Sequence, residues 1–193
     1  MLNKLKKAAL IGSGLLVLAG CSSESADDAS VNSEAVGAET LVVGLDDTFA
    51  PMGFRDENNE IVGFDVDLAK AVGERIGAEI VFQPIDWAMK ETELDSGNID
   101  MIWNGYAITP ERAEKVLLSE PYIVDAQSII VLKDSAIETK ADLEGKLVST
   151  QQSSSSVDKI MEDESGIFGK LGGDLVLYPS NNNAFSDLES GRV

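Results

Sequence analysis

The 193-residue chain has no histidine, a single cysteine and few basic side chains. Without histidine it lacks the residue that most often serves as a general base near neutral pH or as a transition-metal ligand. A single cysteine excludes an intramolecular disulfide, so the hydrophobic core has to hold the fold. Fifteen Lys and Arg stand against 34 Asp and Glu, which gives a formal net charge of −19. Such a surface repels phosphate backbones, and we predict no nucleic-acid partner.

The chain also lacks a run of about 20 apolar residues, the length that a membrane-spanning helix needs. It does have a shorter apolar segment, residues 8–20, which follows three lysines. Its last three residues and the cysteine after them read LAGC, residues 18–21. A basic start, an apolar stretch and small residues at its end are typical of a signal peptide. The LAGC run resembles a bacterial lipobox, and this resemblance implies a lipoprotein signal peptide over 1–20 and a lipid on Cys21. The alternative is an ordinary signal peptide with an accidental cysteine.

Residues 21–40 are rich in Ser, Ala, Asp and Glu and contain no aromatic residue. A segment of this composition cannot bury enough apolar surface to fold, so we expect a flexible acidic linker. About 150 residues follow, enough for one or two small lobes.

From residue 41 onward, short apolar runs alternate with segments of helical periodicity, which predicts an α/β fold with a largely parallel sheet. In the helix expected over 65–76, the apolar positions Leu68, Ala71, Val72 and Ile76 lie on one face. The acidic run 56–60 lacks the glycine and the distal glutamate of a calcium loop, so it predicts a hairpin turn rather than a metal site. The other expected strands are 41–43, 79–82, 99–103, 128–132, 147–150 and 175–178, and the other helices are 87–96, 110–116, 153–161 and 183–190.

Several segments in register resemble the polar-amino-acid-binding proteins of ABC importers. The clearest are GFDVDLAKAVGERIG (63–77), GNIDMIWNGYAITPER (97–112) and QQSSSSVD (151–158). The resemblance implies a two-lobed α/β fold of the periplasmic-binding-protein type (type II). Lobe 1 would cover 41–127 and lobe 2 would cover 128–193, with the second lobe and the return to the first lobe incomplete.

The same resemblance implies a monomeric receptor that captures a polar L-amino acid and delivers it to an ABC permease and its ATPase. It would need no cofactor or metal and would not be an enzyme. Its place would be the extracytoplasmic side of the cell membrane, held there by the lipid anchor. Two alternatives stay open, namely an enzyme on the same fold (a dehydratase or a lytic transglycosylase) and a ligand-sensing module.

Arg112 is the strongest single candidate for ligand binding, because a guanidinium meets a carboxylate with two parallel hydrogen bonds. The resemblance places it where the family holds the α-carboxylate, and the alternative is a surface arginine paired with a neighbouring acid. Gly105 and Ala107 precede it and would offer backbone groups, since glycine allows a ligand to approach closely.

The other candidates divide between the carboxylate and the side chain of the ligand. Ser154 or Ser155 would complete the carboxylate clamp from the second lobe, and the alternative is plain helix capping. Gln151 matches a position that touches the ligand side chain. Asp46, preferred over its neighbour Asp47, would recognise that side chain and suits an amide or a cationic group. Phe49 and Trp87 would enclose it, although either could equally pack in the core.

Overall fold

The computed structural model describes residues 39–193. Cys21, the signal peptide expected over 1–20 and nearly all of the expected linker lie outside the described residues. Among the residues that are described, no helix is both long enough and apolar enough to cross a membrane.

A three-stranded parallel sheet forms the first part of the chain. Its order is β5 (Glu79–Pro84), β1 (Thr40–Leu45) and β6 (Met101–Ile102), with Val43 paired to Phe82 on one side and Met101 on the other. The parallel sheet predicted from the alternation of strands and helices is confirmed. The best-buried apolar side chains in this part of the chain are Val43 and Leu45 of β1, Ile99 just before β6, and Val66 and Ala69 of the following helix.

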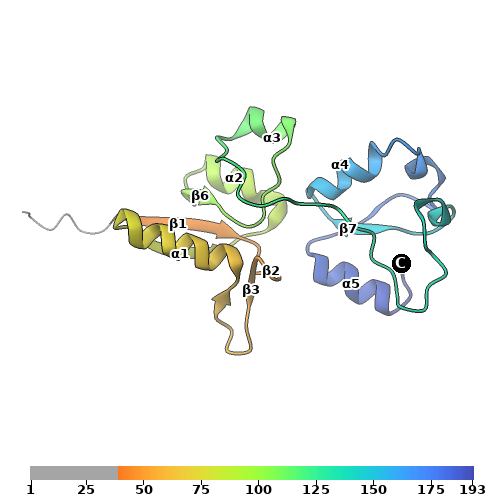
Figure 1. Cartoon of the computed structure of the whole chain (residues 1–193), viewed down its shortest axis with the longest axis horizontal. Coiled ribbons are helices and arrows are strands. Elements are labelled where there is room, and N and C mark those ends of the chain that lie inside the picture. The colour runs from red at the N-terminus through yellow and green to blue at the C-terminus, as the bar shows by residue number, and fades with distance from the viewer. Residues whose placement is uncertain (1–38) are drawn as a thin grey trace, which may run out of the picture. The chain divides into compact units, whose positions relative to one another are not determined.

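The helix α1 (Phe64–Ile76) packs on this sheet (Figure 1), but it buries a different face from the predicted one. Its buried stripe contains Val66, Ala69 and Gly73, whereas Ile76 is 61% exposed. Gly73 explains the difference, because a Cβ atom there would lie 2.5 Å from a side-chain carbon of Ile80 in β5. The helix therefore approaches the sheet through a glycine, which a pattern of large apolar residues does not reveal.

A small antiparallel sheet follows β1 and contains β2 (Thr48–Phe49), β3 (Gly53–Arg55) and β4 (Ile61–Val62). Between β3 and β4, the Asp56 carboxylate accepts hydrogen bonds from the backbone N–H groups of Asn58 and Glu60, both at 2.9 Å. The predicted hairpin turn over the acidic run is confirmed.

Two further helices follow β5 and β6. A 3₁₀ turn at Trp87–Met89 leads into α2 (Lys90–Asp95), and α3 covers Pro110–Lys115. Thr109 caps α3, since its hydroxyl accepts a hydrogen bond from the Arg112 N–H at 3.2 Å.

A second, two-stranded parallel sheet pairs β7 (Ser149–Gln151) with β8 (Val176–Tyr178). The helices α4 (Ser155–Met161) and α5 (Asn181–Glu189) each follow one of these strands, and 3₁₀ turns form at Lys140–Leu143 and Ile167–Lys170. The strands β7 and β8 and the helices α4 and α5 lie within about two residues of the predicted ones. Their buried apolar side chains include Leu143, Ile167 and Ala184.

The strand predicted over 128–132 is wrong. The structure has irregular backbone there, and Ile129 and Ile130 are about half exposed. A strand exists only where a neighbour accepts and donates its backbone hydrogen bonds. Within residues 39–193 no strand pairs with this segment, so its apolar, β-branched composition alone does not make it a strand.

Candidate functional site

The predicted binding residues follow the carboxyl ends of the parallel strands. Asp46 comes directly after β1, Trp87 after β5, Gly105 after β6, and Gln151 ends β7. Open α/β sheets bind their ligands at this edge. Except for Asp46, the predicted ligand-binding residues line a broad depression of about 2750 Å³. An ordinary ligand pocket has about 300–1000 Å³, so the position of a ligand inside this depression has to be argued from individual side chains.

Arg112 is buried, with only 8% of its surface exposed. Its Nη1 donates to the Ala107 carbonyl at 3.0 Å and its Nη2 to the Ser153 carbonyl at 3.4 Å. The guanidinium carbon lies 4.2 Å from the centre of the Tyr106 ring, which is a cation–π contact. No carboxylate of the described residues forms an ion pair with it. Arg112 therefore keeps unused donors and an uncompensated charge.

A second buried cation, Lys90, lies in the same region and is 2% exposed. Its Nζ donates to the carbonyls of Trp87 (3.2 Å) and Ser153 (3.1 Å) and pairs with Glu91 at 3.1 Å. Burial lowers the pKa of Lys90, and the Glu91 carboxylate partly opposes this shift. Lys90 thus uses all three of its protons within the protein.

Glu91 contacts Lys90 and also Tyr106, whose ring faces Arg112. The Tyr106 hydroxyl donates to the Glu91 carboxylate at 2.9 Å. Burial works against the ionised form of Glu91, but the hydrogen bonds from Tyr106 and Lys90 outweigh it and lower its pKa. Burial and the Glu91 carboxylate raise the pKa of Tyr106, so the phenol stays a donor. Glu91 consequently neutralises Lys90 and not Arg112.

Gly105 lies in a tight turn with a φ of 58°. Its N–H donates to the Asp65 carboxylate at 2.6 Å, and the second Asp65 oxygen accepts from the Tyr122 hydroxyl at 2.8 Å. A Cβ atom on Gly105 would lie 3.1 Å from the Phe49 ring. Glycine therefore allows Phe49 to lie against the turn that precedes Arg112.

Asp46 is buried and already has partners. One carboxylate oxygen accepts from the N–H and the hydroxyl of Thr48, and the other accepts from the Gln151 amide nitrogen at 2.6 Å. The same nitrogen donates to the Pro179 carbonyl, and the Gln151 amide oxygen accepts a 3.4 Å bond from Asn181. Asp46 thus fixes the orientation of Gln151.

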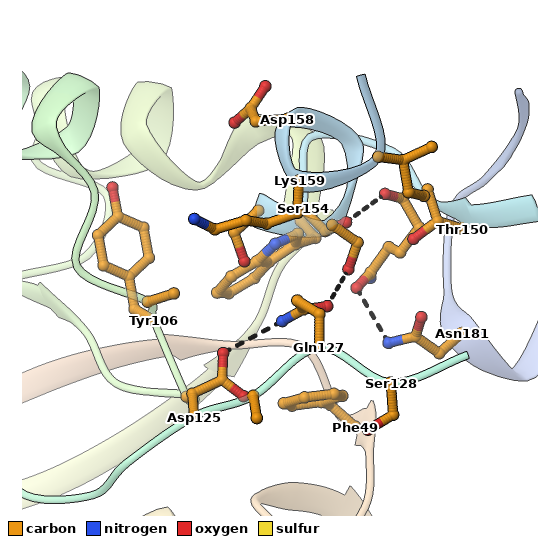
Figure 2. Close-up of a pocket in the computed structure, with 18 of the residues that line it drawn as sticks. Phe49, Tyr106, Asp125, Gln127, Ser128, Thr150, Ser154, Asp158, Lys159 and Asn181 are labelled. Atoms are coloured by element: carbon orange, nitrogen blue, oxygen red, sulfur yellow. Dashed lines mark hydrogen bonds between the residues drawn. The ribbon is translucent and has the colours of Figure 1, made fainter. Parts of the chain in front are cut away.

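The serines after β7 have different roles. The Ser154 hydroxyl donates to the Gln151 carbonyl at 2.7 Å, whereas Ser155 is half-buried and its hydroxyl has no hydrogen-bond partner among the described residues. Figure 2 shows Gln127 beside Asp125, to which its amide donates at 3.1 Å, while Ser156 donates to Gln127. The depression is therefore lined by hydroxyl, amide and carboxylate groups near Ser154.

The structure brings Arg112, Ala107 and the turn that precedes Ser154 into contact, and it places Trp87 in a buried position with its ring edge on Tyr106. Sequence reasoning missed four participants, which are Asp65, Lys90, Glu91 and Tyr106. In the described residues no group of three His, Cys, Asp or Glu side chains could hold a metal ion.

Three comparisons with known proteins identify the family of the chain. Residues 41–188 match the family model "Bacterial extracellular solute-binding proteins, family 3". ABC transporter arginine-binding protein 1 of Escherichia coli K12 is 33% identical over 86% of this chain and 65% of its own length. A Streptococcus pneumoniae substrate-binding protein of an ABC uptake transporter, solved with bound histidine, is 39% identical with a TM-score of 0.78, over 80% of this chain and 63% of its own.

A third relative is the ancestral amino-acid-binding protein AncCDT-1, described as a precursor of cyclohexadienyl dehydratase. It is 34% identical with a TM-score of 0.73, over 80% of this chain and 67% of its own. The chain thus spans about two thirds of the length of these relatives. The chain has the same fold as these relatives, that of the type II periplasmic binding proteins. This is the fold that the resemblance of its sequence segments implied. The chain belongs to the bacterial extracellular solute-binding proteins of family 3.

Proposed function

We propose that this protein captures a polar L-amino acid through its α-carboxylate, which binds Arg112. The supporting observation is that Arg112 is buried and, among the described residues, pairs with no acid. Burying an unpaired charge is costly, so such a site gains free energy when an anion enters it. Two of its five N–H groups bind carbonyls, and the remaining donors suit a carboxylate.

The Ser155 hydroxyl is proposed as a further donor to that carboxylate, and Gly105 as a backbone contact. Ala107 has no hydroxyl, and its carbonyl holds Arg112 in place. Ser154 and Trp87 support the site by packing and by hydrogen bonding within the protein.

The far end of the ligand would meet Phe49, Gln151, Asp125 and Gln127. Asp46 acts there through Gln151, because its carboxylate fixes the Gln151 amide. An acidic and amide-rich surrounding suits a neutral amide or a cationic side chain better than a second carboxylate. The relatives that bind arginine and histidine support this choice.

We further propose that the protein is a lipoprotein anchored through Cys21 on the extracytoplasmic side of the membrane and passes its ligand, as a monomer, to an ABC permease. Family membership and the LAGC run support this role. Catalysis on the same fold is the second candidate, and the relationship to a dehydratase precursor is what favours it. The chain has no histidine to serve as a general base, which favours the receptor.

The test is thermal unfolding of the purified full-length protein with each of the twenty L-amino acids. A ligand at one hundred times its Kd adds about 2.7 kcal/mol to the free energy of unfolding, a shift of several degrees in Tm. We expect a shift with one or a few polar amino acids that Arg112→Lys and Arg112→Gln remove. Lys115→Gln, on the same helix but exposed, should retain the shift. A protein that melts cooperatively and responds to none of the twenty would contradict the proposal.

A further inference from the structure

The carbonyl oxygen of Ser153 accepts hydrogen bonds from two buried cations that lie far from it in the sequence. Lys90 donates across 63 residues at 3.1 Å, and Arg112 across 41 residues at 3.4 Å. Both cations come from helices that follow strands of the first sheet, whereas Ser153 follows β7 of the second sheet. Both helices are therefore hydrogen-bonded to the turn after β7 through the carbonyl oxygen of Ser153.

Ser153 lies in a tight turn between β7 and α4. Its φ of 54° is a left-handed conformation that residues other than glycine adopt rarely. The Ser154 N–H donates to the Gln151 carbonyl at 3.4 Å, and this closes a turn in which a positive φ falls on Ser153. Lys90 and Arg112, both buried, donate to the carbonyl of this strained residue.

The charges around the two cations are unequal. Glu91 pairs with Lys90 at 3.1 Å and accepts from the Tyr106 hydroxyl. Within residues 39–193, the guanidinium of Arg112 contacts the face of the Tyr106 ring and two carbonyls and pairs with no carboxylate. Lys90 is thus neutralised and has no proton left for a ligand. Among the described residues, the Ser153 carbonyl is the one hydrogen-bond partner of its side chain outside its own helical region.

We propose that Lys90 is a positioning residue that holds the turn after β7 against Arg112 and so stabilises the ligand-bound form. This inference rests on the proposed function, in which Arg112 binds the ligand carboxylate. In this proposal the turn moves away from Arg112 when the ligand leaves, and that movement breaks the hydrogen bond between Lys90 and Ser153. Loss of Lys90 should therefore speed ligand dissociation, while association and the order of preference among amino acids stay the same.

The experiment measures association and dissociation rates by stopped-flow fluorescence on the full-length protein. The ligand is the amino acid that raises its Tm most in the thermal unfolding test. Lys90→Met should raise the dissociation rate about tenfold or more, the size expected for one hydrogen bond from a charged donor. Lys115→Met is the matched control. It removes the same charge from an exposed lysine of α3, so both of its rates should stay within about twofold of the wild type.

Because Lys90→Met alone leaves the Glu91 carboxylate without its cation, the double variant Lys90→Met/Glu91→Gln is measured as well. The glutamine retains an oxygen that accepts from Tyr106, and the same rise in dissociation rate is expected. A variant that melts at a lower temperature but releases ligand at the wild-type rate would show a purely structural role and overturn the inference. If the wild type binds no amino acid, the proposed function itself fails, and the inference about Lys90 fails with it.

Discussion

Asp46 and Asp47 are adjacent and identical in chemistry, yet the structure gives them different surroundings. Asp46 is buried and accepts hydrogen bonds from Thr48 and from the Gln151 amide. Asp47 forms an ion pair with Arg55 at 2.5 Å, and the Arg55 side chain is 37% exposed. Buried hydrogen bonds to a charged group contribute more than solvent-exposed ion pairs, so the two acids should differ in their effect on stability.

We therefore expect Asp46→Asn to lower the free energy of unfolding by about 1–3 kcal/mol, because the new amide nitrogen would face a donor of Thr48 or of Gln151. Asp47→Asn should change it by less than about 1 kcal/mol. Urea unfolding of the two variants measures both values. Equal losses for the two variants would show that the bond between Asp46 and Gln151 contributes little.

The roles of single residues could be predicted from the sequence where the cause is a pattern of neighbouring residues. Thr109 was predictable as the cap of α3 because a threonine directly before a proline-initiated helix satisfies its first N–H groups. The contacts of Lys90 and Arg112 with Ser153 were not predictable in this way, because they join positions 63 and 41 residues apart. Only the three-dimensional arrangement of the two sheets determines which carbonyl a buried cation reaches.

At the scale of elements, α1 illustrates what a periodic pattern can and cannot predict. The spacing of its apolar residues correctly predicted a helix ending at Ile76 with Gly77 after it, and Gly77 has the expected left-handed conformation. The pattern did not predict the buried face, because Gly73 makes the closest approach to β5. The strand expected over 128–132 was wrong for a related reason, since a strand depends on a partner that its own sequence does not specify.

The two glycines that bound α1 allow a matched test. Both have a positive φ, but a Cβ on Gly63 would lie 2.4 Å from the Met52 carbonyl oxygen, while a Cβ on Gly77 meets nothing within 4 Å. Gly77→Ala should cost about 1–2 kcal/mol, the strain of a left-handed alanine. Gly63→Ala should cost clearly more, because the backbone of Met52 would have to move as well. The free energies of unfolding in urea check this order, and a reversed order would contradict the close packing at Gly63.

For the whole molecule, the large negative charge limits how the protein can be held at a membrane. A formal net charge of −19 repels anionic lipid headgroups, so electrostatic adsorption does not favour attachment. The proposed acyl chains would supply the attachment, since each buried methylene contributes about 0.8 kcal/mol and two or more chains give stable anchoring. The thiol of Cys21, directly after Leu-Ala-Gly, is the group in this sequence that suits such a modification.

We therefore expect Cys21→Ser to move the protein from the membrane fraction to the soluble fraction of bacterial cells. The serine keeps the size and polarity of the position but cannot form the thioether that carries the lipid. Radiolabelled palmitate should enter the wild type and not the variant, and both should show the same amino-acid-dependent shift in Tm, because the site around Arg112 does not involve Cys21. If the variant stays with the membrane, or if the wild type takes up no label, the anchor on Cys21 is wrong, while the proposed ligand site keeps its own test.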